Sequence, residues 1–276
     1  MGLAVCATPI GNLEDVTLRV LRELAEADVV LCEDTRHTKG LLDRHRIGAK
    51  LLSYHRHNEA QRTAELLPRL EDGERIALVS DAGLPGINDP GARLIAAALD
   101  AGIPVAVLPG PSAVETALVS SGLAGERFQF LGYLPRGAKA LAELWGELAR
   151  WPHPAVAFES PQRLPATLRS LADALPDRPI AVCRELTKRF EEVARGTPVE
   201  LAARFSEPPK GEITLVVGGG GGEDERVDPG EALALPLGAV VELVAAGVPR
   251  RQAADVVARL ARVSRNTLYA ESLKSR

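Results

Sequence analysis

The segment RIALVSDAGLPGINDPG, Arg75–Gly91, joins a short apolar run to a loop rich in glycine and proline. The apolar part, Arg75–Ser80, is too short for a helix and is typical of a strand buried on both faces of a parallel sheet. Similar runs, separated by helix-length amphipathic stretches, occur at Leu3–Thr8, Asp28–Glu33, Leu51–Tyr54 and Pro104–Leu108. The alternation predicts an α/β fold whose first domain is an open, mostly parallel sheet.

A second α/β domain is predicted after a break at Gly132–Gly137, where a proline-containing connector lacks helical period. Its strands are expected at Ala155–Glu159, Ile180–Arg184 and Gly211–Val217. The glycine run Gly218–Gly222 and the acidic residues after it have nothing apolar to bury, which indicates a flexible linker. The expected parts of the chain are domains at 1–132 and 133–218, a linker at 219–236 and a small basic helical module at 237–276.

Capping signals predict where several helices begin. Asn58-x-x-Gln61 and Ser112-x-x-Glu115 match the capping box, in which the first side chain accepts from the helix backbone. Asp89–Pro90, Ser160–Pro161 and Thr197–Pro198 each place a capping residue before a proline, which favours the first helical position.

Composition restricts the class of protein. The 276 residues are 46% hydrophobic and 25% charged, as in a soluble protein with a large core. No apolar run reaches the roughly 18 residues of a membrane span, and no signal peptide is recognisable, so a cytoplasmic location is expected. Cys6, Cys32 and Cys183 lie far apart in apolar runs without zinc-ligand spacing, which predicts reduced core thiols and no metal.

Charge is distributed unevenly along the chain. Residues 245–276 carry a net +5, whereas the whole chain has a net charge of −4, so residues 1–244 carry −9. A basic segment attached to an acidic body favours a polyanionic partner. Arg259, Arg262 and Arg265 are therefore candidates for contacts with RNA phosphates.

Unusual loops follow four of the five predicted strands of the first domain. They are Thr8–Asp15, Glu33–Thr38, Ser80–Gly91 and Pro109–Ala113. Ligands of open parallel sheets bind beside the carboxyl ends of the strands, so these loops predict a site for a flat, polar ligand. Each loop alone also has a structural explanation, because Gly and Pro form turns and Asp caps helices. The absence of G-x-G-x-x-G, Walker and G-x-S-x-G motifs disfavours dinucleotide, ATP and serine-hydrolase sites.

The loop after the second strand contains the candidate catalytic residues Glu33, Asp34, Arg36 and His37. Carboxylates and an imidazole can accept a proton, and a guanidinium can pair with phosphate. The structural alternative is a solvated turn in which the acids cap or pair with the next helix. A second polar cluster, Tyr54–His57, offers an aromatic ring that could stack on a base.

In their order and spacing, these loops resemble the tetrapyrrole methylase superfamily, and within it the branch that methylates the 2′-hydroxyl of a cytidine in the decoding centre of 16S ribosomal RNA. The motifs that carry the resemblance are Thr8–Asn12, Glu33–Arg36, Ser80–Gly91 and Pro109–Ala113. It implies a homodimeric, two-domain α/β enzyme that binds S-adenosylmethionine in a cleft between the domains and acts on the small ribosomal subunit.

Matching these motifs residue by residue implies specific contacts. The implied cofactor contacts are Pro9, Asp81, Leu84, Ser112 and Ala113 in the first domain and Phe158, Cys183 and Glu212 in the second. Asn12 and Asp15 are expected on the substrate side, with the three arginines of the basic segment. Glu33, Asp34 and His37 all remain candidates for a general base. The alternatives are a tetrapyrrole (precorrin-type) or diphthine-type methyltransferase of the same superfamily, or a non-catalytic RNA- or ribosome-binding protein.

Overall fold

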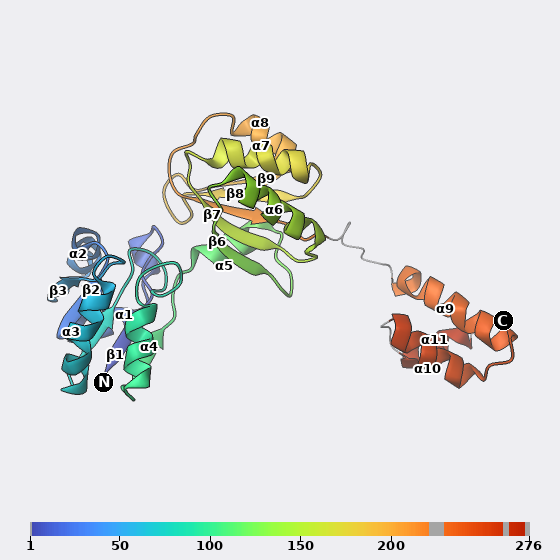
Figure 1. Ribbon diagram of the computed structural model, residues 1–276, viewed down its shortest axis with the longest axis horizontal. Coiled ribbons are helices and arrows are strands. Elements are labelled where there is room, and N and C mark those ends of the chain that lie inside the picture. Colours follow the sequence, from blue (N-terminus) through green and yellow to red (C-terminus); the bar gives the residue numbers. More distant parts are fainter. Residues whose placement is uncertain (1, 221–228, 262–264, 274–276) are drawn as a thin grey trace. The chain divides into compact units, whose positions relative to one another are not determined.

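The computed structural model describes residues 2–220, 229–261 and 265–273 (Figure 1). The chain divides into two compact units, residues 1–220 and 221–276, called here the first and second units. Within the described ranges, no helix combines the length and the apolar composition of a membrane span.

A five-stranded parallel sheet with strand order β3-β2-β4-β1-β5 begins the first unit. The strands are β1 (Leu3–Cys6), β2 (Val29–Cys32), β3 (Leu51–Ser53), β4 (Ile76–Leu78) and β5 (Val105–Leu108). All neighbours pair in parallel, and Leu3 lies between Ile76 and Val105. The prediction of an α/β fold with an open parallel sheet is confirmed. The strands are shorter than predicted by one to three residues.

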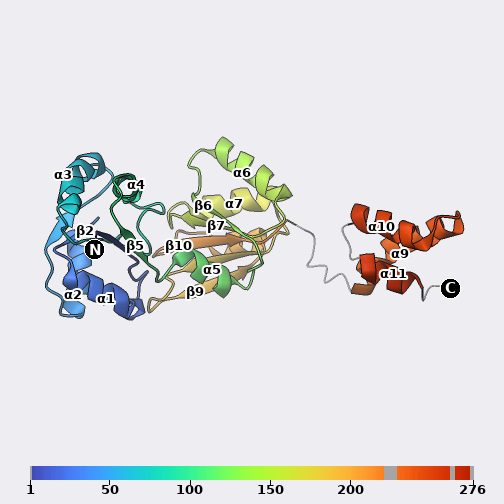
Figure 2. The ribbon, with the colours of Figure 1, turned by 90° about the horizontal axis from the view of Figure 1, so that it is seen from below.

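Helices cover both faces of this sheet (Figure 2). The elements are η1 (Leu13–Asp15), α1 (Leu18–Glu26), α2 (Thr35–Arg44), α3 (Glu59–Glu71) and α4 (Ala92–Asp100). Alternate strand residues enter two cores: Cys6 and Cys32 pack with α1 and α2, whereas Leu3 and Leu31 pack with α3 and α4. The three cysteines are buried and free, as the apolar runs predicted.

The second sheet has the order β6-β7-β10-β8-β9. Its strands are β6 (Gln129–Tyr133), β7 (Ala155–Glu159), β8 (Ile180–Arg184), β9 (Glu192–Gly196) and β10 (Ile213–Val217). The last strand in sequence, β10, lies at the centre and is antiparallel to β7 and β8. One face is covered by α5 (Ala113–Ser121), and the other by α6 (Ala138–Arg150), α7 (Leu164–Ala174) and α8 (Pro198–Arg204) (Figure 2).

The chain passes from the first sheet to the second at α5, before the division expected at residues 132 and 133. α5 packs against β7, β8, β9 and β10. Its Ala117 and Leu118 share a core with Val156 and Val216 of that sheet. Strand β6 continues across the expected boundary. The residues after β5 therefore connect the two sheets directly.

The predicted capping signals have different outcomes. Thr197 forms a complete capping box with Glu200 at the start of α8. Asn58 makes no cap bond to α3, so that prediction is wrong. Its side chain instead accepts from the His55 N–H at 2.8 Å and donates to the Ser53 carbonyl at 3.2 Å. Local turn bonds thus compete successfully with the helix for this side chain.

Three other helix starts also differ from prediction. Ser112 is the N-cap residue of α5, but its hydroxyl donates to the Glu115 carboxylate and no capping box forms. Helices α4 and α7 begin at Ala92 and Leu164, after the proline expected at their first position. The cap of α4 is Gly91 with φ +139°, a conformation that side chains other than glycine rarely adopt.

In the described residues of the second unit, three helices pack on one another. They are α9 (Pro229–Ala245), α10 (Arg250–Ala261) and α11 (Arg265–Ser272). Their shared core contains Val240, Ala253, Ala254, Val257 and Leu268. α9 begins inside the range 219–236 expected as a linker. The sequence also predicts that Ser264 caps the third of these helices. Ser264, Arg262 and residues 221–228 of the expected linker lie outside the described residues.

Candidate functional site

The loops that follow β1, β4 and β5 lie close to one another. Thr8 and Gly83 exchange backbone hydrogen bonds of 2.8 and 3.0 Å, and the buried Thr8 hydroxyl donates to the Ser80 carbonyl at 2.9 Å. A Cβ on Gly110 would lie 2.9 Å from the Cβ of Ala7, so the loop after β5 approaches β1 closely. The carboxyl edge of the sheet is thus fixed largely by backbone contacts.

The residues with implied cofactor contacts in this half occupy different environments. Pro9 is buried, whereas Asp81 and Leu84 are partly exposed. The Asp81 carboxylate accepts the backbone N–H of Asp34 at 3.1 Å and so joins the loops after β4 and β2. Ser112 and Ala113 lie at the start of α5, whose first turn receives no hydrogen bond from the Ser112 side chain. Helix N–H groups without such a bond can bind a polar ligand.

Glu33, Asp81 and Asp89 form a group of mutually interacting acids, called here the carboxylate cluster. Burial, followed by the charges of Glu33 and Asp81, raises the pKa of Asp89 to about 6. Burial, followed by the charge of Asp81, also raises the pKa of Glu33. Arg56 partly offsets both effects and donates to the Asn88 carbonyl at 2.6 Å. In the sequence, Asp89 is recognisable only as a helix cap before Pro90, and no motif predicts this cluster.

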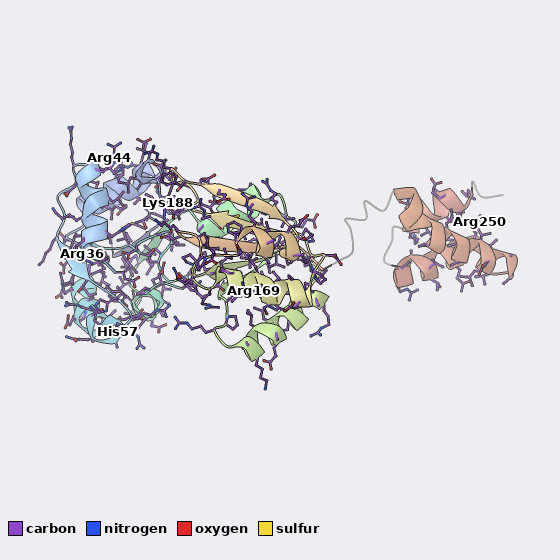
Figure 3. The ribbon with its side chains drawn as sticks, turned by 90° about the horizontal axis from the view of Figure 1, so that it is seen from above. Arg36, Arg44, His57, Arg169, Lys188 and Arg250 are labelled. Carbon is purple, nitrogen blue, oxygen red and sulfur yellow. The ribbon has the colours of Figure 1, made fainter. Side chains whose placement is uncertain are left out.

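Asp34 and Arg36 interact with each other. The Asp34 carboxylate caps α2 by accepting the Arg36 N–H at 2.8 Å, and it pairs with the Arg36 guanidinium at 2.8 Å. These bonds hold the pKa of Asp34 well below its usual range. The Arg36 side chain is 89% exposed (Figure 3), and His37 is exposed in the same turn of α2. Glu33 is therefore the predicted catalytic residue that joins the carboxylate cluster.

The register of the second sheet brings its three predicted cofactor contacts to one edge. Thr214 pairs with Phe158 on one side and with Cys183 on the other. Because β10 is antiparallel to both neighbours, it begins where β7 and β8 end, and Glu212 directly precedes it. The ring of Phe158 contacts Tyr133 edge to face, with 5.5 Å between centroids.

Cys183 does not present its side chain to a ligand at this edge. It is 1% exposed, and its thiol donates to the Ala117 carbonyl of α5 at 3.7 Å. Burial raises the pKa of the thiol to about 11. A cofactor contact by Cys183 would therefore involve its main chain.

Residues of both sheets meet at the loop after β1. The Asn12 N–H donates to the Thr187 hydroxyl at 3.0 Å, and a Cβ on Gly11 would lie 2.5 Å from Cγ of Lys188. Lys188 lies at this junction (Figure 3) and pairs with Glu212 at 2.9 Å. Asn12 and Glu212, predicted from separate motifs, are thus connected through Thr187 and Lys188. Thr187 and Lys188 were not predicted from the sequence, in which Gly11, directly before Asn12, is the one sign of a close contact here.

A second junction involves Tyr133 and the carboxylate cluster. A Cβ on Gly132 would lie 3.0 Å from the side-chain oxygen of Asn88 in the loop after β4. Partial burial and then the charges of Asp89 and Glu212 raise the pKa of the Tyr133 phenol. Tyr133 is thus influenced by acids of both sheets, and no sequence motif indicated it.

The prediction that Tyr54 stacks on a base is wrong. Its side chain is 1% exposed, and its hydroxyl bonds to Glu59 at 3.2 Å and Thr63 at 3.0 Å. Glu59 also accepts the Gly91 N–H at 3.0 Å. Tyr54 therefore supports the loop after β4 from within the core.

Three further predicted substrate residues lie in the described part of the chain. Asp15 is exposed at the end of η1. Arg259 and Arg265 belong to the second unit, where both are near Asp255, at 3.6 and 3.7 Å.

The two sheets and the loops between them define the class of protein. The model of the tetrapyrrole (corrin/porphyrin) methylases matches residues 2–202. The chain belongs to this family of S-adenosylmethionine-dependent methyltransferases, which confirms the resemblance seen in the motifs.

More specific likenesses cover nearly the whole chain. It is 43% identical over 271 residues to "Ribosomal RNA small subunit methyltransferase I" of Halalkalibacterium halodurans, covering 97% of this chain and 93% of that protein. It is also 43% identical to the protein of the same name from Synechocystis, covering 99% and 97%. Among solved structures, a uroporphyrin-III C-methyltransferase from Thermus thermophilus in complex with S-adenosylhomocysteine shares the fold, with a TM-score of 0.55 at 20% identity, covering 79% and 97%.

Proposed function

We propose that this protein transfers a methyl group from S-adenosylmethionine to the 2′-hydroxyl of a cytidine in the decoding centre of 16S ribosomal RNA. The supporting observation is the extent of each likeness. The relatives named as ribosomal RNA methyltransferases match 97% and 99% of the chain, including the second unit. The uroporphyrin-III C-methyltransferase matches 79%. An RNA substrate therefore explains more of the chain than a tetrapyrrole does.

The residues at the carboxyl edge of the first sheet fit S-adenosylmethionine. Asp81 offers a partly exposed carboxylate, and the first turn of α5 after Ser112 offers N–H groups without a side-chain cap. Gly83 has φ +75°, which favours glycine, and a Cβ there would lie 3.8 Å from the Pro111 carbonyl, so the loops after β4 and β5 lie close together at this edge. When bound, this cofactor supplies an electrophilic methyl group on a sulfonium, which is a good leaving group.

The protein must then orient the ribose hydroxyl and accept its proton. Glu33 suits this task because its carboxylate is partly buried in the carboxylate cluster and its pKa is raised, which makes it a stronger base. Asp34 suits it less, because its lowered pKa and its pairing with Arg36 make it a weaker base. His37 is exposed at the start of α2. Among the three candidates left open by the sequence, we therefore assign the proton acceptor to Glu33, the one in the carboxylate cluster.

We further infer a homodimer that works on the small ribosomal subunit in the cytoplasm. The exposed apolar side chains of Val107, on the edge strand β5, and Val119, on α5, support a protein interface. Light scattering of the purified protein tests this point, and a monomer at all concentrations would contradict it.

The function is tested by methyl transfer. Purified protein and labelled S-adenosylmethionine are incubated with small ribosomal subunits from cells that lack the modification, and the labelled nucleotide is mapped by nuclease digestion and mass spectrometry. We expect a 2′-O-methylcytidine in the decoding centre and no label in premodified subunits. Label on another nucleotide, or transfer to a tetrapyrrole instead, would contradict the proposal. RNA binding without cofactor binding would favour a non-catalytic protein.

A further inference from the structure

The second unit has a hollow of about 240 Å³ on its surface, lined by Arg251, Ala254, Arg265 and Tyr269. Arg251 and Ala254 lie three residues apart on α10, and Arg265 and Tyr269 lie four apart on α11. Residues at these spacings occupy one face of a helix. Because α10 and α11 pack on each other, the two faces together form the hollow.

The base of the hollow belongs to the core of the second unit. Ala254 is fully buried beside Val257 and Leu268. Tyr269 follows the buried Leu268 and is 38% exposed, so its ring is available at the surface. The shape of the hollow is thus set by the packing of two helices rather than by a loop.

The hollow carries an excess of positive charge. The Asp255 carboxylate is 3.7 Å from the Arg265 guanidinium and 3.6 Å from that of Arg259. One carboxylate is thus shared by two cations, and both distances are longer than those of a good hydrogen bond. In the part of the chain that the structure describes, no carboxylate forms an ion pair with Arg251. Exposed ion pairs of this kind are weak, and a phosphate can displace Asp255 from Arg265.

The size of the hollow limits its occupant. Pockets that enclose a drug-sized ligand usually have roughly 300–1,000 Å³, so this site suits a short part of a polymer better than a whole cofactor. Guanidinium groups bind phosphate oxygens, and an exposed aromatic ring stacks on an unpaired base. Two arginines and a tyrosine around one hollow provide both contacts.

We propose that this hollow binds one nucleotide of single-stranded RNA, with its phosphate at Arg251 and Arg265 and its base against Tyr269. The proposal rests on the proposed function in taking ribosomal RNA as the polymer. The proposed site differs from the RNA contacts expected from sequence, which were Arg259, Arg262 and Arg265. It combines residues of two helices with an aromatic ring, and Arg259 does not line the hollow.

The test measures the fluorescence anisotropy of a short labelled single-stranded RNA of mixed sequence with the full-length protein over a range of salt concentrations. Arg251→Gln and Arg265→Gln should each reduce the log–log salt slope by about 0.7. Tyr269→Leu should weaken binding about tenfold, whereas Tyr269→Phe should bind as the unchanged protein does. Arg169→Gln is the matched control, because it removes an exposed arginine from α7 in the first unit (Figure 3) and should have no effect.

A sixth variant tests whether misfolding explains the losses. Asp255→Asn removes the competing carboxylate and should strengthen RNA binding, which an unfolded unit could not do. The proposal is overturned if Tyr269→Leu binds as tightly as Tyr269→Phe, or if Arg251→Gln behaves like Arg169→Gln. It is also overturned if polyglutamate competes with the RNA at equal charge concentration, because the site would then select acidic chains in general.

These results are separable from the proposed function. If the unchanged protein methylates small subunits but the hollow variants bind RNA as it does, only the proposed nucleotide site in the hollow is overturned. If the variants change RNA binding as expected but the unchanged protein transfers no methyl group, only the proposed function is overturned.

Discussion

Replacing Glu33 with glutamine removes one negative charge from the carboxylate cluster and preserves the size of the side chain. Burial and the neighbouring Asp81 raise the pKa of Glu33, so ionisation of this group is less favourable in the folded protein than in the unfolded chain. Glu33→Gln should therefore leave the melting temperature near pH 7 unchanged or raise it. Activity should move in the opposite direction, because a proposed proton acceptor is lost.

The size of the activity loss follows from this environment. Positioned general bases contribute roughly 10²–10⁴-fold to rates. Glu33 is only partly buried, and the thioether leaves the methyl group of the sulfonium readily, so we expect the lower end, about 100-fold. This corresponds to about 2.7 kcal/mol of transition-state stabilisation.

The assay compares initial rates of label transfer to small ribosomal subunits, with cofactor affinity measured by calorimetry and stability measured by thermal melting. Glu147→Gln, the same change on an exposed position of α6, is the matched control. A near-normal rate in Glu33→Gln would refute the assignment of the base. A rate that falls together with the melting temperature would show a structural role instead.

Three further predictions concern other acids. Asp81→Asn keeps an oxygen for the Asp34 N–H, so the protein should fold while calorimetry detects weaker S-adenosylmethionine binding; unchanged affinity would contradict the cofactor assignment. Burial raises the pKa of Asp89 to about 6. The protonated carboxyl group therefore contributes fully to the free energy of unfolding below about pH 4, and this contribution is lost as the pH rises toward 6. Asp89→Asn should therefore melt higher than the unchanged protein at about pH 8 and lose this advantage toward about pH 4, and parallel melting curves across this range would contradict it. Glu159 is fully buried and pairs with Arg163 at 3.2 Å, so Glu159→Ala should lower the free energy of unfolding in urea by about 3 kcal/mol, whereas a loss below about 1 kcal/mol would show that the pair is dispensable.

Most of the strands that the sequence predicted are buried on both faces and form continuous apolar runs. The edge strands β3 and β5 are partly exposed, but the sequence also predicted them because their residues are apolar. The two that it missed, β6 and β9, are the edges of the second sheet. β9 contains Glu192 and Arg195, which are partly exposed or exposed, so its apolar pattern is weak. β6 contains Gly132 with φ +67° and a register shift between Phe130 and Tyr133, which interrupts its alternation. Exposure and irregularity remove the signal on which strand prediction depends.

The candidate site shows a similar division. Motifs at strand ends identified the loops, because topology alone brings the carboxyl ends of parallel strands together. They did not identify the charge interaction between Glu33 and Asp89, since burial and mutual repulsion arise from packing of segments distant in sequence. For the same reason Tyr54 looked available for stacking, although the fold buries it.

The passage of the chain through α5 has a consequence for how the protein is made. The first sheet is complete once Leu108 has left the ribosome, but α5 must wait for a sheet whose central strand, β10, is synthesised last. Until then the apolar side of α5 has no surface to cover, and β7 and β8 lack the strand that joins them. The second half of the first unit should therefore assemble in one late step, after synthesis has passed Val217. A chain released before that point would expose Ala117 and Leu118, which could then bind apolar surfaces of other proteins. Protection of this protein from such contacts therefore depends on synthesis of its last strand.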